Sequence, residues 1–282
     1  MSRKIACLTL DMEGDFKDPE GRIRLFEDEA LLRRYVELVE EHGVKVTAFL
    51  VTSLLDRYAD DFRRMSDLIP VEFESHSHAH DLSNPCSRAD IEASVSAFRA
   101  FAGRDPVGYR APVGLITREG LDTLFDLGFR YDSSIYPSLR PGTLGHNNLH
   151  LPVSPFKIRR GAEAIVEVPF GTVSGVRLDF SLSYVKMLGW KTYEIAMKAF
   201  SLPDQVAVLS HPYDHYFHVL PYEIRDWMAP LLRRNARSAF DLLGTMLGYL
   251  RGQGYEFAFM SDLCDDLATQ PLRELPAEKV VR

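Results

Sequence analysis

The chain has 282 residues, of which 46% are hydrophobic and 26% are charged, as in a soluble globular enzyme rather than a disordered or fibrous protein. Its formal net charge of −7 and the absence of a long run of Lys and Arg argue against nucleic acid as a partner, because tracking phosphates requires a basic stripe. The three cysteines are scattered and lack CxxC spacing, which predicts reduced thiols in a cytosolic protein.

Membrane insertion is not expected from the distribution of apolar residues. No stretch approaches the ~20 apolar residues that a spanning helix requires. The apolar part of the first segment, which ends at Asp11, is too short for an export signal. We therefore expect a cytoplasmic protein, with the inner membrane face as an alternative location.

Apolar runs and helical repeats alternate along the chain. The first strand is expected over residues 4–11. The first helix is expected within residues 30–43, with Asp28 as its N-cap and Gly43 just past its last residue. The pattern then predicts strand 44–51, helix 53–66, strand 70–75, helix 87–103, strand 107–110, helix 117–128, strand 129–134, strand 164–170, helix 181–199, strand 205–211, helix 235–252 and strand 255–260.

This alternation favours an α/β fold with a parallel sheet, because strands that alternate with helices are joined by right-handed crossovers. About seven such units predict a distorted (β/α) barrel, and we expect one catalytic domain over residues 1–268. The helix after residue 86 begins with a capping box of Ser87 and Asp90. The stretch 137–162 is too long for a plain connection and is expected to form a lid or a substrate wall. The polar tail, 269–282, is expected to lack fixed structure.

Polar residues follow several of the predicted strands, at the ends where parallel barrels carry their active sites. These residues are Asp11, Glu13, His76, His78, His80, Arg110, Asp132 and His211. His76 and His80 lie one helical turn apart, whereas His78 would share a side with either of them only on an extended strand. Two imidazoles and one carboxylate form a three-ligand metal site that leaves positions open for water.

These motifs resemble the polysaccharide deacetylases, also called NodB-like carbohydrate esterases, over residues 4–260. The family's H-[S/T]-x-x-H element is matched by HSHAH, its R-x-P element by RAPVG and its Leu-x-His element by LSH. The resemblance implies a NodB-type barrel with His76 and His80 as metal ligands. Two adjacent aspartates usually precede a glycine in this family, but this chain reads TLDMEG. We expect Asp11 to act as the base and Glu13 to supply the metal carboxylate.

The resemblance implies metal-dependent removal of an N- or O-acyl group from a sugar. One divalent ion, expected to be Zn²⁺ with Co²⁺, Ni²⁺, Mn²⁺ or Fe²⁺ as alternatives, would polarise the acyl carbonyl and bind the attacking water. Asp11 would take the water's proton, and Arg110 would orient Asp11 and hold it ionised. His211 would protonate the departing amine. The family's Asp-Trp element is missing in that form, and YDSS offers Asp132 as the carboxylate beside this imidazole.

Four further residues are candidates for binding the substrate. The resemblance implies that Leu209 lines a small acyl pocket. Pro112, Tyr136 and Tyr213 are expected to contact the sugar, the two tyrosines through aromatic faces that suit sugar rings. The expected substrates are N-acylated sugars, nucleotide sugars or lipid-linked sugars of glycan biosynthesis, carrying either an acetyl or a formyl group.

Two other functions compete with this interpretation. Asp11 and Glu13 on a first strand also resemble the opening motif of DEDD exonucleases, which hold two divalent ions for phosphodiester cleavage. The other alternative is a saccharide-binding barrel that has lost catalysis, which Met12 in place of an aspartate would signal, because a fold does not guarantee a function. Metal titration combined with a measurement of acyl release would separate the three.

Overall fold

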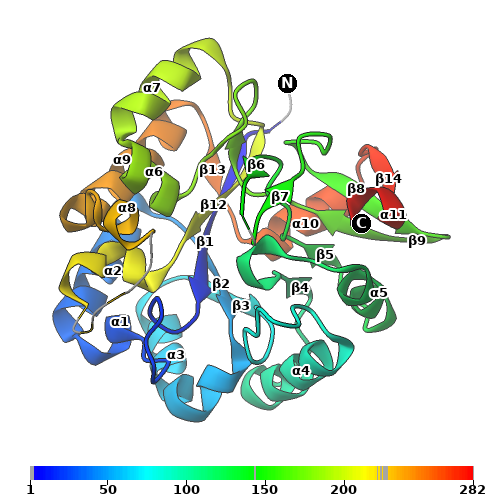
Figure 1. Ribbon diagram of the computed structural model, residues 1–282, viewed down its shortest axis with the longest axis horizontal. Coiled ribbons are helices and arrows are strands. Elements are labelled where there is room, and N and C mark those ends of the chain that lie inside the picture. Colours follow the sequence, from blue (N-terminus) through cyan, green and yellow to red (C-terminus); the bar gives the residue numbers. More distant parts are fainter. Residues whose placement is uncertain (1–2, 143, 221, 223, 225–227, 282) are drawn as a thin grey trace.

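The centre of the molecule is a parallel sheet, seen in a computed structural model that describes residues 3–142, 144–220, 222, 224 and 228–281 (Figure 1). Within these residues, neighbouring strands pair in parallel in the order β12-β1-β2-β3-β4-β5-β9. Their bounds are β1 (Ile5–Met12), β2 (Val46–Leu50), β3 (Val71–Ser75), β4 (Gly108–Tyr109), β5 (Tyr131–Asp132), β9 (Glu163–Glu167) and β12 (Gln205–Ser210).

The two ends of this row of strands meet just after β9. Phe170 forms a parallel bridge with Ala207 of β12, and the backbone N–H of Gly171 donates to the carbonyl of Ala207 at 2.8 Å. The sheet therefore curls round to its first strand, and the strand ends that carry the site residues face one rim. The expected α/β fold with a distorted parallel barrel is confirmed.

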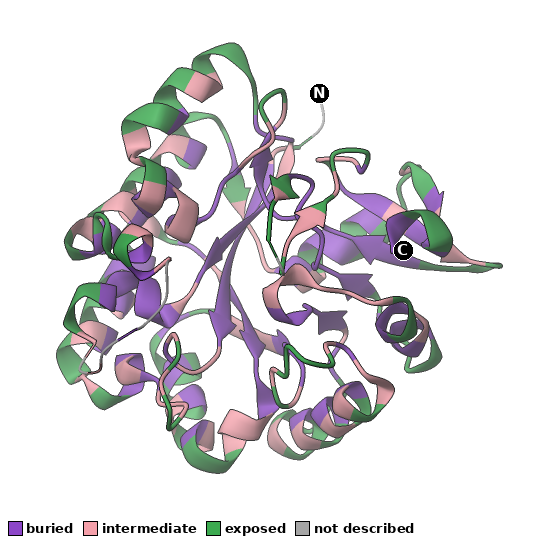
Figure 2. Cartoon of the chain, viewed as in Figure 1, coloured by how far each residue is buried: buried purple, intermediate pink, exposed green. Residues whose placement is uncertain are grey.

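The buried strands explain why their sequences are apolar on both sides. Every residue of β1 and of β2 is buried, as expected for parallel strands that lie between a packed interior and a layer of helices. Figure 2 shows the buried strands at the centre and the exposed residues on the outer sides of the helices.

Helices cover the outside of the barrel (Figure 1). The described ones are α1 (Arg24–Glu27), α2 (Glu29–His42), α3 (Leu55–Leu68), α4 (Arg88–Ala102), α5 (Arg118–Asp126), α6 (Leu182–Leu188), α7 (Trp190–Ala199), α8 (Ala229–Arg233), α9 (Ala239–Gly252), α10 (Met260–Ala268) and α11 (Ala277–Val280). Short 3₁₀ helices are η1 (Thr52–Leu54), η2 (Pro112–Gly114), η3 (Pro212–His215), η4 (Phe217–Val219) and η5 (Ala236–Ser238). Among these elements, no helix is both long enough and apolar enough to span a bilayer.

The predicted helix signals are largely confirmed. The Asp28 carboxylate accepts from the backbone N–H of Ala30 at 3.0 Å, which caps α2, and Gly43 ends that helix in the left-handed conformation with φ 51°. One helix predicted over 181–199 is in fact two, α6 and α7, because Gly189 interrupts it with φ 82°. α10 was not predicted.

The C-terminal tail does not lack structure, so that expectation is wrong. β8 (Phe156–Arg160) pairs antiparallel with β9, and β14 (Glu274–Pro276) pairs parallel with β8. Leu275 and Val280 are buried, so the tail packs on the sheet despite its polar composition. The stretch 137–162 is also only partly irregular. It contains β8 and a hairpin of β6 (Leu139–Arg140) with β7 (His146–Asn147). The remaining short strands are β10 (Thr172–Val173), β11 (Leu178–Asp179) and β13 (Glu256–Phe257).

Candidate active site

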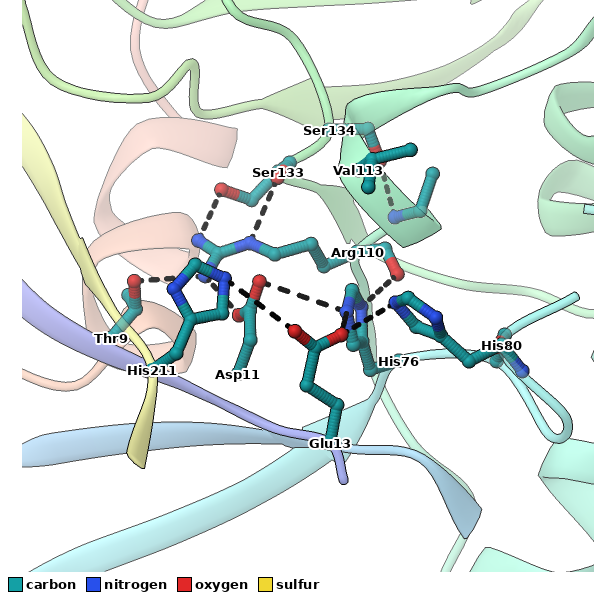
Figure 3. Close-up of polar contacts among 12 residues, drawn as sticks. Thr9, Asp11, Glu13, His76, His80, Arg110, Val113, Ser133, Ser134 and His211 are labelled. Carbon is teal, nitrogen blue, oxygen red and sulfur yellow. Dashed lines mark hydrogen bonds and ion pairs between the residues drawn. The ribbon is translucent and has the colours of Figure 1, made fainter. Parts of the chain in front are cut away.

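Glu13, His76 and His80 form the centre of the candidate site (Figure 3). One ligand atom from each of these side chains lies within 4.8 Å of the others. Nε2 of His80 is 2.6 Å from Oε2 of Glu13, and Nε2 of His76 is 3.9 Å from the same oxygen. A separation of 2.6 Å is that of a charge-assisted hydrogen bond, which requires one proton between the His80 nitrogen and the Glu13 oxygen. Two imidazoles and one carboxylate match the donor set of catalytic zinc sites.

His76 presents a defined nitrogen to this centre. Its Nδ1 lies 2.8 Å from the backbone carbonyl of Arg110, an acceptor, so Nδ1 carries the proton and Nε2 keeps its lone pair. Burial lowers the pKa of His76, which favours the neutral ring that a metal ligand requires.

A turn, rather than a helix, brings His80 back toward His76. Ser77 and His80 have positive φ values of 69° and 52°, and the Ser77 hydroxyl accepts from the backbone N–H of His80 at 3.0 Å. The two imidazole rings lie 5.1 Å apart. His78 points elsewhere, with Nδ1 3.1 Å from the hydroxyl of Thr52. His76 and His80 therefore lie close together, as their spacing predicted, but a turn rather than a helix brings them there.

Asp90 anchors this turn from α4. Its carboxylate accepts from the backbone N–H of His78 at 3.0 Å and of Ala79 at 2.8 Å. The Ser87 hydroxyl accepts from the backbone N–H of Asp90 at 3.3 Å, so the N-cap half of the predicted capping box is present. The Asp90 carboxylate does not complete the capping box, because it accepts from the turn between His76 and His80 instead.

Asp11 lies at the end of β1, beside the three candidate ligands. Its Oδ1 accepts from Nη1 of Arg110 at 2.7 Å, and its Oδ2 is 3.7 Å from Nε2 of His76. The Arg110 guanidinium is fully buried between the rings of Phe49 and Phe170, with its carbon 4.1 and 4.6 Å from their centroids. The expected pairing of Asp11 with Arg110 is present in the structure.

The charges around Glu13 favour its ionised form. Burial alone would raise the pKa of Glu13, but the nearby His80, His211 and His76 bring it down to about 2. In turn, Glu13 raises the pKa of His80 against the effect of burial. The hydroxyl of Tyr213 donates to Oε1 of Glu13 at 2.9 Å, which fixes the carboxylate.

His211 follows β12 and reaches the opposite oxygen of Glu13, with Nε2 3.9 Å from Oε1 (Figure 3). Its Nδ1 is 3.2 Å from Oδ2 of Asp214. Burial opposes a charge on His211, but the hydrogen bond and charge of Asp214 raise its pKa to about 9. Burial also opposes ionisation of Asp214, yet the cations Lys186 and His211 hold its pKa well below its usual range.

The carboxylate beside His211 is therefore Asp214 and not Asp132, which corrects the sequence prediction. Asp132 accepts from the Ser134 hydroxyl at 2.5 Å, and that hydroxyl accepts from the backbone N–H of Ala111 at 2.8 Å. Asp132 thus supports the loop after Arg110. The sequence did contain a signal for Asp214. This aspartate lies three residues after His211, which is the spacing of a capping box, and η3 begins with that box.

The four predicted substrate contacts lie in different surroundings. Leu209 and Tyr136 form a small buried cluster with Phe170. The Tyr136 ring stacks on Phe170 at 3.8 Å between centroids, and on His146 of β7 at 5.4 Å, so the β6–β7 hairpin lies against this cluster. Pro112 is buried in η2. Tyr213 stacks on the imidazole of His211 at 4.9 Å.

Comparison with known proteins agrees with these motifs. The family model described as polysaccharide deacetylase matches residues 3–131. No curated protein matches the chain. The chain is similar in fold to a Mycobacterium smegmatis protein assigned to the polysaccharide deacetylases, with 17% identity, a TM-score of 0.60, and coverage of 97% of this chain and 93% of the other.

Two other solved structures have the same fold. One is a peptidoglycan N-acetylglucosamine deacetylase, with 15% identity, a TM-score of 0.53, and coverage of 93% of this chain and 88% of that chain. The other is a CE4 family pseudoenzyme from Bacillus anthracis, with 15% identity, a TM-score of 0.53, and coverage of 94% of this chain and 66% of that chain.

Proposed function

We propose that the chain, whose residues 3–131 match the family model of the polysaccharide deacetylases, is a metal-dependent hydrolase that removes an N-acyl group, acetyl or formyl, from a sugar or glycan precursor. The observation that carries this proposal is the convergence of Glu13, His76 and His80 between two further titratable side chains, Asp11 and His211. Metal ligands, base and acid are thus supplied by three separate segments of the chain, at the ends of β1, β3 and β12.

Glu13, His76 and His80 would hold one divalent ion, with Zn²⁺ as the first candidate, because it accepts two imidazoles and one carboxylate. When bound, such an ion polarises an acyl carbonyl and increases the acidity of water. The chain's own contribution is to fix the donors. The Arg110 carbonyl sets the tautomer of His76, and the Tyr213 hydroxyl holds Glu13.

Asp11 is the proposed general base. Arg110 occupies its Oδ1 at 2.7 Å, which leaves Oδ2, the oxygen nearer to His76, to take the proton of the attacking water. The side chain cannot turn away, because the guanidinium that holds it also donates to the Thr9 hydroxyl at 2.8 Å and to the Ser133 carbonyl at 3.0 Å.

His211 is the proposed general acid. Its Nδ1 is held by Asp214, so Nε2 is the nitrogen that can donate toward the departing amine. With a pKa of about 9, His211 carries its proton at neutral pH, as a general acid requires.

The substrate would lie between the cluster of Leu209, Tyr136 and Phe170 and the stacked rings of Tyr213 and His211. We assign the acyl group to the cluster of Leu209, Tyr136 and Phe170, which is apolar and lies against Arg110 through Phe170. The sugar would contact Tyr213 and Pro112. An N-acylated sugar, a nucleotide sugar and a lipid-linked sugar all fit this role. The three free cysteines, all buried, support a cytoplasmic location.

The decisive experiment measures acyl release. The metal-stripped protein is reloaded with Zn²⁺ or Co²⁺ and incubated with free, nucleotide-linked and lipid-linked N-acetyl and N-formyl amino sugars, and the amines are detected by mass spectrometry. We expect metal-dependent appearance of one free amine, with no product from the His76→Ala variant. Stoichiometric metal binding without any product would instead support a saccharide-binding barrel.

A further inference from the structure

A lysine that is shielded from water lies behind His211. Lys186, on α6, has no exposed surface, and its Nζ lies 2.9 Å from Oδ1 of Asp214. Lysine side chains are almost never fully buried unless they are paired, because an isolated charge is costly to remove from water. The pair lies next to the proposed acid, because Asp214 also contacts His211.

Asp214 is held at both of its oxygens. Oδ1 accepts from Lys186 and, at 2.8 Å, from the Ser183 hydroxyl. Oδ2 accepts from the backbone N–H of His211 at 3.0 Å and lies 3.2 Å from Nδ1 of the same residue. Ser183 and Lys186 are three residues apart and therefore share one side of α6. Asp214 thus connects this helix to the end of β12.

This arrangement keeps Asp214 paired before and after proton transfer. Before transfer, the carboxylate faces two cations, Lys186 and protonated His211. When Nε2 gives its proton to the amine nitrogen as the C–N bond breaks, the imidazole becomes neutral. Without Lys186, the transfer would then leave Asp214 as an unpaired buried anion, which is strongly unfavourable. With Lys186 in place, the ion pair persists throughout.

We propose that Lys186 is a positioning residue for hydrolysis, which holds Asp214 so that His211 keeps its orientation and can release its proton. This inference rests on the proposed function, in which His211 is the general acid. Lys186 acts only through Asp214 and does not contact the substrate. Its effect should therefore depend on how much the leaving group needs a proton.

Leaving-group dependence provides the test. The Lys186→Met variant is compared with the unmodified protein on the N-acyl sugar, which leaves as an amine, and on 4-nitrophenyl acetate, whose phenolate needs no proton. We expect kcat for the sugar to fall roughly 10–100-fold, as for other partners of catalytic groups, with KM and metal content unchanged and ester hydrolysis retained. Lys45→Met, which removes an exposed Lys–Asp pair of 3.2 Å with Asp262, is the matched control and should change neither activity.

A second comparison separates positioning from a general structural effect. In a His211→Ala background, Lys186→Met should cause no further loss, because the acid through which it acts is already gone. If Lys186→Met does not fold, the Lys186→Met/Asp214→Asn variant leaves no unpaired charge and should show the same selective loss of sugar turnover. Equal loss on both substrates, further loss in the His211→Ala background, or unchanged turnover would each overturn the inference. An unmodified protein that is inactive on every sugar would contradict the proposed function itself.

Discussion

Arg110 and Asp11 form an ion pair of 2.7 Å inside the barrel, where the exposed fractions of the two side chains are 0% and 5%. Each partner compensates the charge of the other in largely buried surroundings. The pair joins the end of β1 to the loop after β4, so the position of the proposed base depends on a residue that lies far from it in the sequence.

Removal of one partner should therefore destabilise the fold. We expect Arg110→Met to lower the free energy of unfolding by about 3–5 kcal/mol, because Asp11 is left as an unpaired buried charge. The Arg110→Met/Asp11→Asn variant should recover a substantial part of this loss. Urea unfolding followed by circular dichroism measures both, and a loss below about 1 kcal/mol in Arg110→Met would show that the pair is not coupled as described.

Substitution of a metal ligand should abolish metal binding, whereas substitution of the proposed base should reduce turnover alone. We expect His76→Ala to lose the divalent ion, because one of three ligands is removed. Asp11→Asn should retain the ion while kcat falls roughly 10²–10⁴-fold, as for loss of a general base. Calorimetric titration with Zn²⁺ and acyl-release kinetics on the same preparations check this. Loss of metal in Asp11→Asn would make Asp11 a ligand rather than the base.

The contacts of Asp90 should influence metal affinity from a distance. Asp90→Ala removes both hydrogen bonds that the carboxylate accepts from the turn between His76 and His80, so the two rings lose their fixed separation. We expect the affinity for Zn²⁺ to fall roughly 10–100-fold, as for other outer partners of metal ligands. Ser87→Ala is the matched control, because it removes the cap of α4 without touching the turn. Equal affinities in the two variants would contradict this role.

A buried pair of acids should make stability depend on pH. Asp132 and Glu167 are both fully buried and lie opposite each other on the adjacent strands β5 and β9. Burial raises the pKa of Asp132 to about 6 and the pKa of Glu167 well above its usual value. The folded state therefore binds more protons than the unfolded state above pH ~4, so the stability from this pair is present at low pH and lost as pH rises through 6 and beyond.

Glu167→Gln removes one of these acids and leaves a neutral amide opposite Asp132. We expect the free energy of unfolding of the variant to fall less than that of the unmodified protein between pH 5 and pH 8, because one fewer buried acid has to lose its proton. Glu163→Gln, an exposed position on the same strand, should leave the pH dependence unchanged. Thermal unfolding across this pH range tests the sign. A variant whose stability falls in parallel with the unmodified protein would rule out the pair as the cause.

The sequence predicted the central strands because burial on both faces requires continuous apolar runs, as in β1. Asp28 and Gly43 were predictable because their side-chain and backbone properties act locally. The C-terminal strand was not, since its few apolar residues become significant only once β8 lies beside them. β8 itself was hidden in a polar, proline-containing stretch that reads as a loop.

The candidate site was predictable in its residue types but not in all of its pairings. His76 and His80 meet because two positive φ values close the turn, and this conformation cannot be read from the spacing alone. Asp132 and Asp214 both lie at or just beyond a strand, and only the structure shows which one reaches His211. The Ser134 hydroxyl donates to Asp132 and holds it away from His211, whereas Lys186 donates to Asp214 and holds it beside His211.

The short strand β14 has a consequence for aggregation. It covers the outer edge of β8, whose backbone would otherwise offer unpaired N–H and C=O groups to another chain. β14 itself ends in Pro276, which has no N–H, and begins with the charged Glu274, so it is a poor template for further pairing. Residues remote from the candidate site thus protect the edge of the sheet, and a protein shortened before residue 274 should associate edge to edge.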